Sequence, residues 1–217
     1  EYREVHQKAA VLYRKQARFK LITTGKISQK NLLFEDQHLE RLRTASRYFA
    51  FPFDPEILRQ KIEAECQACD ANQDYRLRIS LNKSGEIEVD RQVLEPLSPT
   101  FCKAKICLQE ANLQQAFTYF KTTHRPHLSL GEQEIIYYNK SGEVLETTIG
   151  NLVLKIAGKL YTPPIRLGIL PGIYRQHLLE TGQVEEKVLT LADLTQAEAI
   201  YGCNAVRDLY ELQVIGL

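Results

Sequence analysis

The chain has 217 residues, of which 44% are hydrophobic and 25% are charged, a composition typical of a folded protein with one large domain or two lobes. Its 28 basic and 27 acidic side chains nearly cancel, which argues against nucleic acid or an anionic membrane as the partner. The longest apolar stretches, such as NLVLKIAGKLY, are interrupted by lysines well short of the roughly 20 residues of a membrane-spanning helix, so we expect a cytoplasmic protein.

The use of methionine and cysteine adds two expectations. Methionine is absent from the sequence, so we expect that position 1 is not a native start and that the chain is a fragment of a longer one. The five cysteines are an odd number without secretory context and predict reduced thiols. Two pairs raise the question of zinc, namely Cys66 with Cys69 and Cys102 with Cys107. The first pair lies in a helical pattern and the second is spaced too loosely for a zinc knuckle, so we expect no metal.

The first half of the chain is rich in helical spacing. Apolar residues recur at intervals of three and four in three segments and alternate with polar residues in a fourth. The spacing predicts a helix over 3–16, a strand over 18–28, a helix over 38–51 and a helix over 54–72. Proline at position 52 favours an end to the second of these helices.

The second half is dominated by predicted hairpins. Alternating strands flank the letters NKSGE in two hairpins, and we interpret this shared motif as repeated turn chemistry. The predicted hairpins cover 75–89, 134–148 and 151–164, helices follow over 171–182 and 191–202, and strand-like segments finish the chain over 200–215. Helices combined with antiparallel hairpins predict an α+β fold and not a doubly wound parallel sheet.

Two lobes are expected from this pattern. We predict a smaller N-terminal lobe over 1–108, an interdomain linker over 109–118 that includes the polar run QEANLQQ, and a β-rich C-terminal lobe over 119–217. No GxGxxG or P-loop motif occurs, so the usual fingerprints of dinucleotide and nucleoside triphosphate binding are absent.

Several segments carry side chains suited to chemistry or to anion binding. FKTTHRPHL, residues 120–128, places Lys121 near Arg125, and Lys121 is either a solvated lysine or a reactive amine. PGIYRQ predicts a helix that starts at Gly172 or Ile173, where unpaired N–H groups bind anions and Arg175 lies in the same turn. A plain helix start explains this segment equally well.

Two further candidates remain ambiguous from the pattern. His38 and Arg41 fall three residues apart on one helix face, where they would contact a phosphate or solvent. Glu146, near the end of a predicted strand, is either exposed or buried with a partner. For both, exposure to solvent is the safer expectation from the pattern alone.

Five segments taken together resemble a known family. In order they are HLERLRTAS, the lysine of FKTTHRP, GEVLETTIGNLVLK, KLYTPPIRLGILPGIYRQ and AIYGCNAVRDL. They resemble the class IV pyridoxal-phosphate enzymes, which include branched-chain and D-amino-acid aminotransferases and aminodeoxychorismate lyase. The resemblance runs from about residue 18 to about residue 214 and implies a two-lobed fold with the cofactor, pyridoxal 5'-phosphate, in a cleft between the lobes.

Finer motifs favour one branch of the family. KTTHRP, ITTGKI and TPP followed by GILPG resemble the lyase branch, especially the lyase-like module fused behind component I of aminodeoxychorismate synthase. The N-terminal EYREVHQKAA resembles the join that precedes this module. We therefore expect a C-terminal fragment of such a fusion.

The resemblance implies roles for three residues at the centre of the site. Lys121 matches the Schiff-base lysine, which needs a lowered pKa to attack an aldehyde and later to take a proton. Glu146 matches the carboxylate that pairs with the pyridine nitrogen and keeps the ring able to accept electrons. Arg41 matches the phosphate-binding arginine, whose planar, two-pronged donor suits an oxyanion.

The same resemblance implies further phosphate contacts from backbone groups. Gly172 and Ile173 would donate N–H groups, and Asn204 with Ala205 would approach from the last loop. Tyr174 and Ala205 stand where relatives often have threonine, so the backbone would have to replace hydroxyl contacts.

Three residues are expected on the substrate side. Thr24 in ITTGKI matches a lyase threonine near the reacting carbon and is a candidate for proton handling or for holding the leaving oxygen. Arg78 resembles a carboxylate-binding arginine of aminotransferases. Arg125, four residues after Lys121, is a candidate for substrate binding and for lowering the lysine pKa.

Three functions remain open from the sequence. The first is a lyase that converts 4-amino-4-deoxychorismate to 4-aminobenzoate and pyruvate for folate synthesis. The second is an aminotransferase that acts on a branched-chain or D-amino acid with 2-oxoglutarate and ping-pong kinetics. The third is a non-catalytic remnant that docks to or stabilises a partner. The resemblance also leads us to expect a homodimer, with fusion to or association with aminodeoxychorismate synthase.

Overall fold

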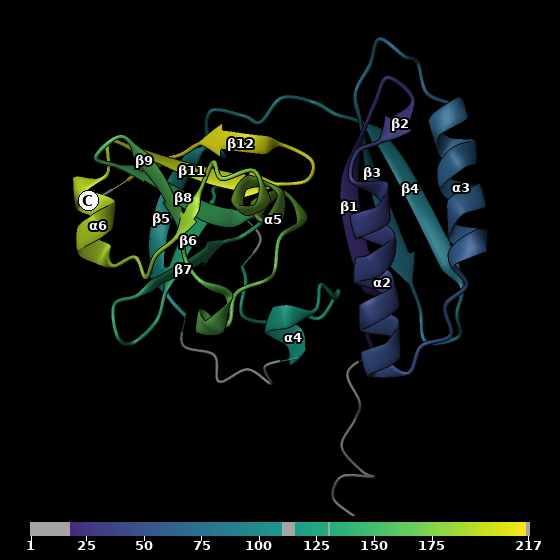
Figure 1. The fold of residues 1–217 in the computed structure, drawn as a ribbon, viewed down its shortest axis with the longest axis horizontal. Coiled ribbons are helices and arrows are strands. Elements are labelled where there is room, and N and C mark those ends of the chain that lie inside the picture. The colour runs from purple at the N-terminus through teal and green to yellow at the C-terminus, as the bar shows by residue number, and fades with distance from the viewer. Residues whose placement is uncertain (1–17, 110–115, 130, 216–217) are drawn as a thin grey trace, which may run out of the picture.

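The computed structural model describes residues 18–109, 116–129 and 131–215, and the predicted helix over 3–16 lies outside them. The described chain forms two lobes, each built on its own sheet (Figure 1). The elements of the first lobe are β1 (Leu21–Ser28), β2 (Asn31–Leu32), α2 (Glu35–Phe49), α3 (Pro55–Gln67), β3 (Tyr75–Leu81) and β4 (Ile87–Val93). Its strands are all antiparallel, in the order β2-β1-β3-β4.

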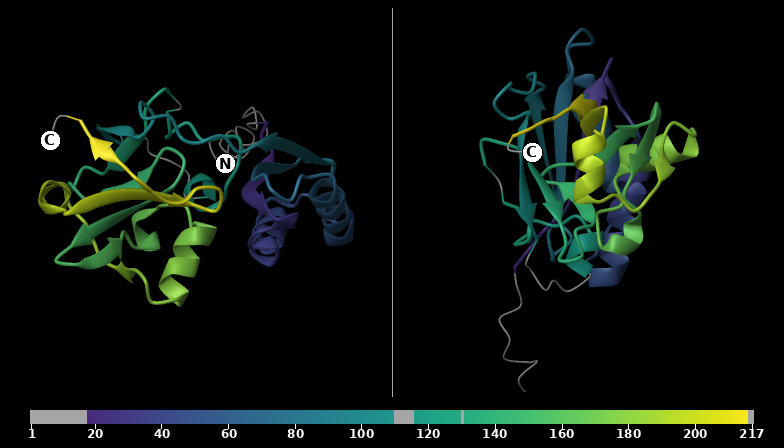
Figure 2. Two further views of the ribbon diagram at one scale, coloured as in Figure 1. Left: turned by 90° about the horizontal axis from the view of Figure 1, so that it is seen from above. Right: turned by 90° about the vertical axis from the view of Figure 1, so that its left-hand side faces the viewer.

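The first lobe has one sheet face covered by two helices and one face without them (Figure 2). Leu21 and Ile27 of β1 are buried in the first core, whereas Thr24 and Lys26 point to the opposite face and are half-buried. This alternation follows from the two-residue period of a strand. Asp54 caps α3 by accepting from two backbone N–H groups, and proline at the first helical position fits its start.

The second lobe surrounds a larger, mixed sheet. Its elements are β5 (Lys103–Leu108), α4 (Ala116–Tyr119), β6 (Ile135–Tyr138), β7 (Val144–Thr147), β8 (Asn151–Ile156), β9 (Lys159–Thr162), the 3₁₀ turn η1 (Ile165–Leu167), α5 (Ile173–Glu180), β10 (Glu185–Glu186), α6 (Leu191–Gln196), β11 (Ala199–Asn204), β12 (Asp208–Glu211) and β13 (Gln213–Val214). Strand β8 pairs with β9, β7 and β11, which joins the hairpins into one body.

The predicted α+β class with two sheets is confirmed, and the pattern missed some local features. The strand pairs β5 with β6, β5 with β13, and β9 with β10 are parallel, so the second sheet is mixed and not purely antiparallel. The strand β5 lies in this second sheet, although the sequence placed residues 1–108 in the first lobe. A short strand whose partners are distant in sequence gives no hairpin signal.

The two NKSGE turns have the same hydrogen bonds, as predicted. In one, the Asn82 side chain accepts from the N–H groups of Ser84 and Glu86 at 3.0 Å. In the other, the Asn139 side chain accepts from Ser141 and Glu143 at 3.0 Å. Glycine follows in each turn with a positive φ of 88° or 76°, which explains the shared letters.

The described residues contain neither a membrane-spanning helix nor a cluster of metal-binding side chains. None of the helices within 18–109, 116–129 and 131–215 is long and apolar enough to cross a membrane. In that same part of the chain, no three histidine, cysteine or acidic side chains gather in a way that would hold a metal ion.

Candidate active site

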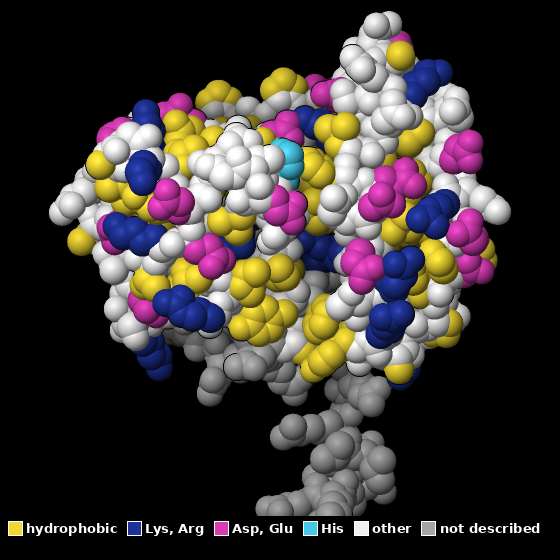
Figure 3. Space-filling model, in the orientation of Figure 1, with side chains coloured by type: hydrophobic (Ala, Val, Ile, Leu, Met, Phe, Trp, Pro, Cys, Tyr) yellow, Lys and Arg dark blue, Asp and Glu magenta, His cyan; other side chains and the backbone are white. Residues whose placement is uncertain are grey.

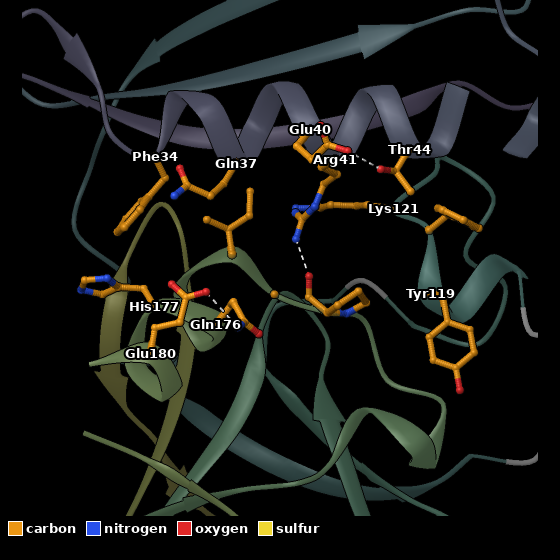
Figure 4. Close-up of a pocket in the computed structure, with 14 residues that line it drawn as sticks. Phe34, Gln37, Glu40, Arg41, Thr44, Tyr119, Lys121, Gln176, His177 and Glu180 are labelled. Atoms are coloured by element: carbon orange, nitrogen blue, oxygen red, sulfur yellow. Dashed lines mark hydrogen bonds between the residues drawn. The ribbon is translucent and has the colours of Figure 1, made fainter. Parts of the chain in front are cut away.

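A cavity of about 320 Å³ lies between the two lobes. The space-filling view shows a hollow there with basic side chains inside it (Figure 3). Helix α2 of the first lobe, the segment after α4 and the first turns of α5 surround this cavity (Figure 4). Its lining residues are Phe34, Gln37, Glu40, Arg41, Thr44, Tyr119, Phe120, Lys121, Pro171, Gly172, Ile173, Gln176, His177 and Glu180.

Lys121 enters this cavity from a backbone that is fixed to the first lobe. The Lys121 carbonyl accepts from Ile22 N at 2.9 Å, and Thr123 N donates to the Lys20 carbonyl at 2.9 Å. The segment therefore extends the edge of β1, and Thr122 between these bonds is fully buried. This attachment leaves the Lys121 side chain free to point between the lobes, beside Arg41 (Figure 4).

The environment of Lys121 favours a neutral amine. Burial, followed by the charges of Arg41 and Arg125, holds the pKa of Lys121 well below its ordinary value of 10.5. Arg78 and Arg76 add to the same effect. A neutral amine is the form that attacks a carbonyl or takes a proton, so Lys121 has the chemistry of a nucleophile or a base.

Glu146 lies in β7 and is only 2% exposed, so the exposed position that its pattern favoured is wrong. Its Oε2 accepts from Leu170 N at 3.3 Å, whereas its buried Oε1 has no hydrogen-bond partner among the described residues. Burial raises the pKa of Glu146 to about 7, and the charges of Arg125 and Lys121 act in the opposite direction. The carboxylate therefore offers one unused acceptor within the electrostatic range of Lys121.

Arg41 connects the two lobes. Its side chain leaves α2, and Nη2 donates to the Pro171 carbonyl at 2.6 Å, directly before α5 (Figure 4). Burial, followed by the charge of Arg125, lowers the pKa of Arg41 to about 10. A guanidinium next to a helix start forms a strong site for an oxyanion.

The backbone at the start of α5 lies very close to the Asn151 side chain. Gly172 is the residue before the first helical turn, and a Cβ at this position would lie 1.9 Å from Asn151 Oδ1. Asn151 is buried and donates from Nδ2 to the Leu170 carbonyl at 2.8 Å. Since the first N–H groups of a helix have no partner within the helix, Gly172 and Ile173 present donors to the cavity.

Two of the three predicted substrate-side residues, Thr24 and Arg78, lie on the open face of the first sheet. Thr24 and Arg78 are partners across β1 and β3, and both are half-buried. Arg78 contributes to the lowered pKa of Lys121, so it lies within electrostatic range of that amine. Arg125 has a buried Nε without a hydrogen-bond partner in the described part of the chain, and it interacts electrostatically with Glu146.

Asn204 and Ala205 lie at the end of β11, outside the cavity lining. The Asn204 side chain closes its own turn, because Oδ1 accepts from Val206 N and Arg207 N at 2.9 Å. Ala205 is 6% exposed. The preceding Cys203 pairs with Asn151, so this loop lies next to the residue that contacts the start of α5.

Two residues singled out from the pattern are buried and contact other protein groups. His38 is fully buried, its Nδ1 lies 2.6 Å from Thr23 Oγ1, and burial lowers its pKa to about 3. Arg175 is 1% exposed and donates to the Pro163 carbonyl at 2.8 Å and to Glu186 at 2.5 Å. Helical spacing places such residues on a helix face but does not show whether this face is turned inward.

Asn151 was missed by the sequence analysis. A polar residue at the start of the apolar run NLVLKI was the available signal, because a buried amide requires partners. Its partners come from residue 170, so only the folded chain identifies its role.

This arrangement agrees with a comparison to known proteins. A family model described as "Amino-transferase class IV" matches residues 20–215. The chain belongs to this family. A protein from Thermotoga maritima named "Probable branched-chain-amino-acid aminotransferase" is 25% identical to this chain. The match covers 76% of this chain and 66% of that protein.

The aminodeoxychorismate lyase of Saccharomyces cerevisiae is 23% identical to this class IV chain. That match covers 79% of the chain and only 64% of the length of the yeast enzyme. Among solved structures, the PLP-bound form of a Mycobacterium tuberculosis protein titled "A hypothetical aminotransferase" superposes with a TM-score of 0.73. It is 19% identical, and the match covers 91% of this chain and 81% of that one. The lyase and aminotransferase names thus occur at similar distances.

Proposed function

We propose that this class IV protein is a pyridoxal-phosphate-dependent lyase that converts 4-amino-4-deoxychorismate to 4-aminobenzoate and pyruvate. The observation that carries this proposal is that a buried carboxylate with a free oxygen lies within electrostatic range of an amine of lowered pKa. Because pKa values shifted in opposite directions are typical of groups that carry out proton transfer, we assign chemistry to Lys121 and Glu146.

The residues present fit the cofactor. Arg41 and the N–H groups at Gly172 and Ile173 would hold its phosphate, since they place a guanidinium and a helix start at one cavity. The free Oε1 of Glu146 would accept from a protonated ring nitrogen. The amine of Lys121 lies within electrostatic range of both Arg41 and Glu146. Pyridoxal phosphate would supply an aldehyde for the substrate amine and a ring that accepts an electron pair.

The protein side chains then have separate tasks. Lys121 would act as the general base that takes the proton from carbon 4 of the substrate ring. Glu146 would hold the proton on the ring nitrogen, which favours the electron-accepting form. Loss of the carbon 4 proton and departure of the enolpyruvyl oxygen would leave an aromatic substrate ring, so the remaining tasks of the protein are orientation and charge stabilisation.

The open sheet face supports a substrate with carboxylates. Thr24 would bind or protonate the leaving oxygen, because it stands opposite Arg78, which lies within electrostatic range of Lys121. Arg78 and Arg125 would bind carboxylates of the substrate. Among the described residues neither arginine forms a salt bridge with a carboxylate, and Arg125 has a buried donor without a hydrogen-bond partner. The yeast relative named as this lyase adds support.

The decisive test is to incubate the purified protein and pyridoxal phosphate with enzymatically made 4-amino-4-deoxychorismate and to follow 4-aminobenzoate by fluorescence. We expect product from the wild type and from Lys140→Ala, an exposed control lysine. Lys121→Ala should lose activity by at least about a hundredfold, as expected when a general base is removed. Equal rates for Lys121→Ala and wild type would refute the role of Lys121.

A second measurement separates binding from turnover. Borohydride reduction followed by peptide mass spectrometry should show the cofactor attached at Lys121. A protein that takes up no cofactor would instead support the non-catalytic alternative. The aminotransferase alternative is favoured by the Thermotoga maritima relative, and formation of glutamate from 2-oxoglutarate with L- or D-amino acids, without 4-aminobenzoate, would establish it.

We also propose that the protein is a homodimer and that it works fused to or associated with aminodeoxychorismate synthase. This part of the proposal rests on the sequence resemblance to the family. Light scattering of the purified chain and its co-purification with component I of the synthase would test the two statements separately.

A further inference from the structure

The carboxyl group that the proposed function uses, Glu146, is followed by a tight turn over residues 147–150. The turn is closed by its own bonds, because Thr147 N donates to the Gly150 carbonyl at 2.9 Å and Gly150 N donates to Thr147 Oγ1 at 3.1 Å. It is attached to the start of β6, where Ile135 N donates to Thr148 Oγ1 at 3.2 Å and Thr148 N donates to the Ile135 carbonyl at 3.1 Å.

A second buried carboxylate lies behind this turn. Glu134 is fully buried, its Oε1 accepts from Ile149 N at 3.2 Å, and its Oε2 accepts from the Tyr210 hydroxyl at 3.0 Å. Since a buried carboxylate is costly unless it is hydrogen bonded, such a set of donors fixes the turn in one position.

Tyr210 completes the support from the other side. A Cβ at Gly150 would lie 3.1 Å from the Tyr210 hydroxyl oxygen, and a Cβ at Gly202 would lie 2.4 Å from its ring. The Tyr210 side chain therefore lies close to two glycines, one of which belongs to the turn.

The position of this turn determines where the protein groups that are proposed to bind the cofactor lie. Glu146 and Asn151 flank it and are partners in the β7 and β8 pairing. Both side chains bind the backbone of Leu170. Glu146 Oε2 accepts from Leu170 N at 3.3 Å, and Asn151 Nδ2 donates to the Leu170 carbonyl at 2.8 Å. Residue 170 leads through Pro171 into the start of α5.

We propose that Glu134 and Tyr210 are positioning residues that hold the 147–150 turn, and through it both the Glu146 carboxylate and the start of α5. This inference rests on the proposed function for the identity of the bound cofactor. The two residues belong to the support of the site, since the Glu134 carboxylate and the Tyr210 hydroxyl are both occupied by bonds to other protein groups.

The inference is tested with Tyr210→Phe, which removes one hydroxyl, and with Glu134→Gln, which keeps the acceptor for Ile149 N. Two quantities are measured by equilibrium dialysis and absorbance titration, namely the dissociation constant of pyridoxal phosphate and the pH at which its bound absorbance changes. We expect Tyr210→Phe to weaken binding by about tenfold, the usual effect of losing one buried hydrogen bond, and to shift the pH midpoint in the same direction as Glu146→Gln.

The Glu134 variants keep the test informative if Tyr210→Phe does not fold. Glu134→Gln should stay closer to wild type than Glu134→Ala in both measurements, because only the amide can still accept from Ile149 N. The matched controls are Glu143→Gln, in the same hairpin but bonded to Asn139, and Tyr161→Phe in β9, and both should behave as wild type.

A double variant shows whether Tyr210 acts through Glu146 or only contributes to the stability of the fold. If the supports act through this carboxylate, Tyr210→Phe should shift the pH midpoint in the wild type and not in a Glu146→Gln background. The inference is overturned if Glu146→Gln shifts the midpoint while the Tyr210 and Glu134 variants keep wild-type midpoints and affinities. Absence of cofactor binding by the wild type would refute the proposed function itself.

Discussion

Burial determines the chemistry of individual residues in this site. The carboxyl group of Glu146 is removed from water and has one oxygen without a protein partner in the described chain. The same kind of environment keeps Lys121 toward its neutral form and His38 neutral down to a pKa of about 3. A buried ionisable group that does not stabilise the fold is a strong indication of function.

The first prediction concerns the stability of the cofactor-free protein. The pKa of Glu146 is raised from 4.5 to about 7, so the folded state binds more protons than the unfolded state between these values and loses stability as pH rises through them. One pKa unit corresponds to about 1.4 kcal/mol, so the cost approaches about 3 kcal/mol above pH 7. Glu146→Gln removes this cost and should stabilise the apoprotein at pH 8, with little effect at pH 4.5.

Urea unfolding at the two pH values measures this difference. Glu132→Gln, at an exposed position, serves as the control and should leave the pH dependence unchanged. A Glu146→Gln protein that is less stable than wild type at pH 8 would contradict the assigned pKa shift.

Among the elements, α5 shows how a local sequence serves a distant site. Its eight residues begin after a glycine that has no room for a side chain, because Asn151 occupies the adjacent space. The buried Arg175 fixes the helix to the sheet. The helix start is therefore held rigidly against Arg41 of the other lobe.

The second prediction follows from this close approach. Gly172→Ala would place a methyl group 1.9 Å from Asn151 Oδ1, so the start of α5 must move. We expect the affinity for pyridoxal phosphate to fall by about tenfold or more, as for the loss of a buried hydrogen bond to a charged group. Gly131→Ala is the matched control, since a Cβ there has no described heavy atom within 4 Å.

Equilibrium dialysis of the two variants provides the measurement. The double variant Gly172→Ala with Asn151→Ala should recover part of the lost affinity, because the clash is removed. Unchanged binding by the single variant would show that the start of α5 does not contact the phosphate.

At the scale of the whole molecule, the site exists only where the two lobes meet. Arg41 comes from the first lobe and Gly172 from the second, and Lys121 lies on a segment bonded to β1. Lys26 and Asp208 also form an ion pair between the lobes. A ligand held by both lobes should therefore stabilise the arrangement as a whole.

The third prediction is that pyridoxal phosphate raises the melting temperature. Saturation at about one hundred times the dissociation constant contributes about 2.7 kcal/mol to stability. Arg41→Lys should reduce this shift, because an ammonium cannot provide the two-pronged contact of a guanidinium. Arg43→Lys, on the same helix but paired with Glu40, should keep the full shift in differential scanning fluorimetry.

The elements with local signals were predictable from the sequence. Both NKSGE turns, the helix over α2 and the start of α5 at Gly172 follow from short-range patterns. The strand β5 did not, because its partners β6 and β13 give it no neighbouring turn signal. The orientation of His38 and Arg175 was also beyond the pattern, which specifies spacing along a helix and not which neighbour covers it.

The sequence by itself determined the α+β class, the turns and the order of motifs that resemble the class IV family. Periodicity and turn chemistry act over a few residues, so they can be read without a fold. Only the tertiary structure decided that Glu146 is buried, that it lies within electrostatic range of Lys121, and that Asn151, Glu134 and Tyr210 support it. Burial and hydrogen bonding depend on contacts between distant segments, and these contacts give the carboxylate and the amine their shifted pKa values.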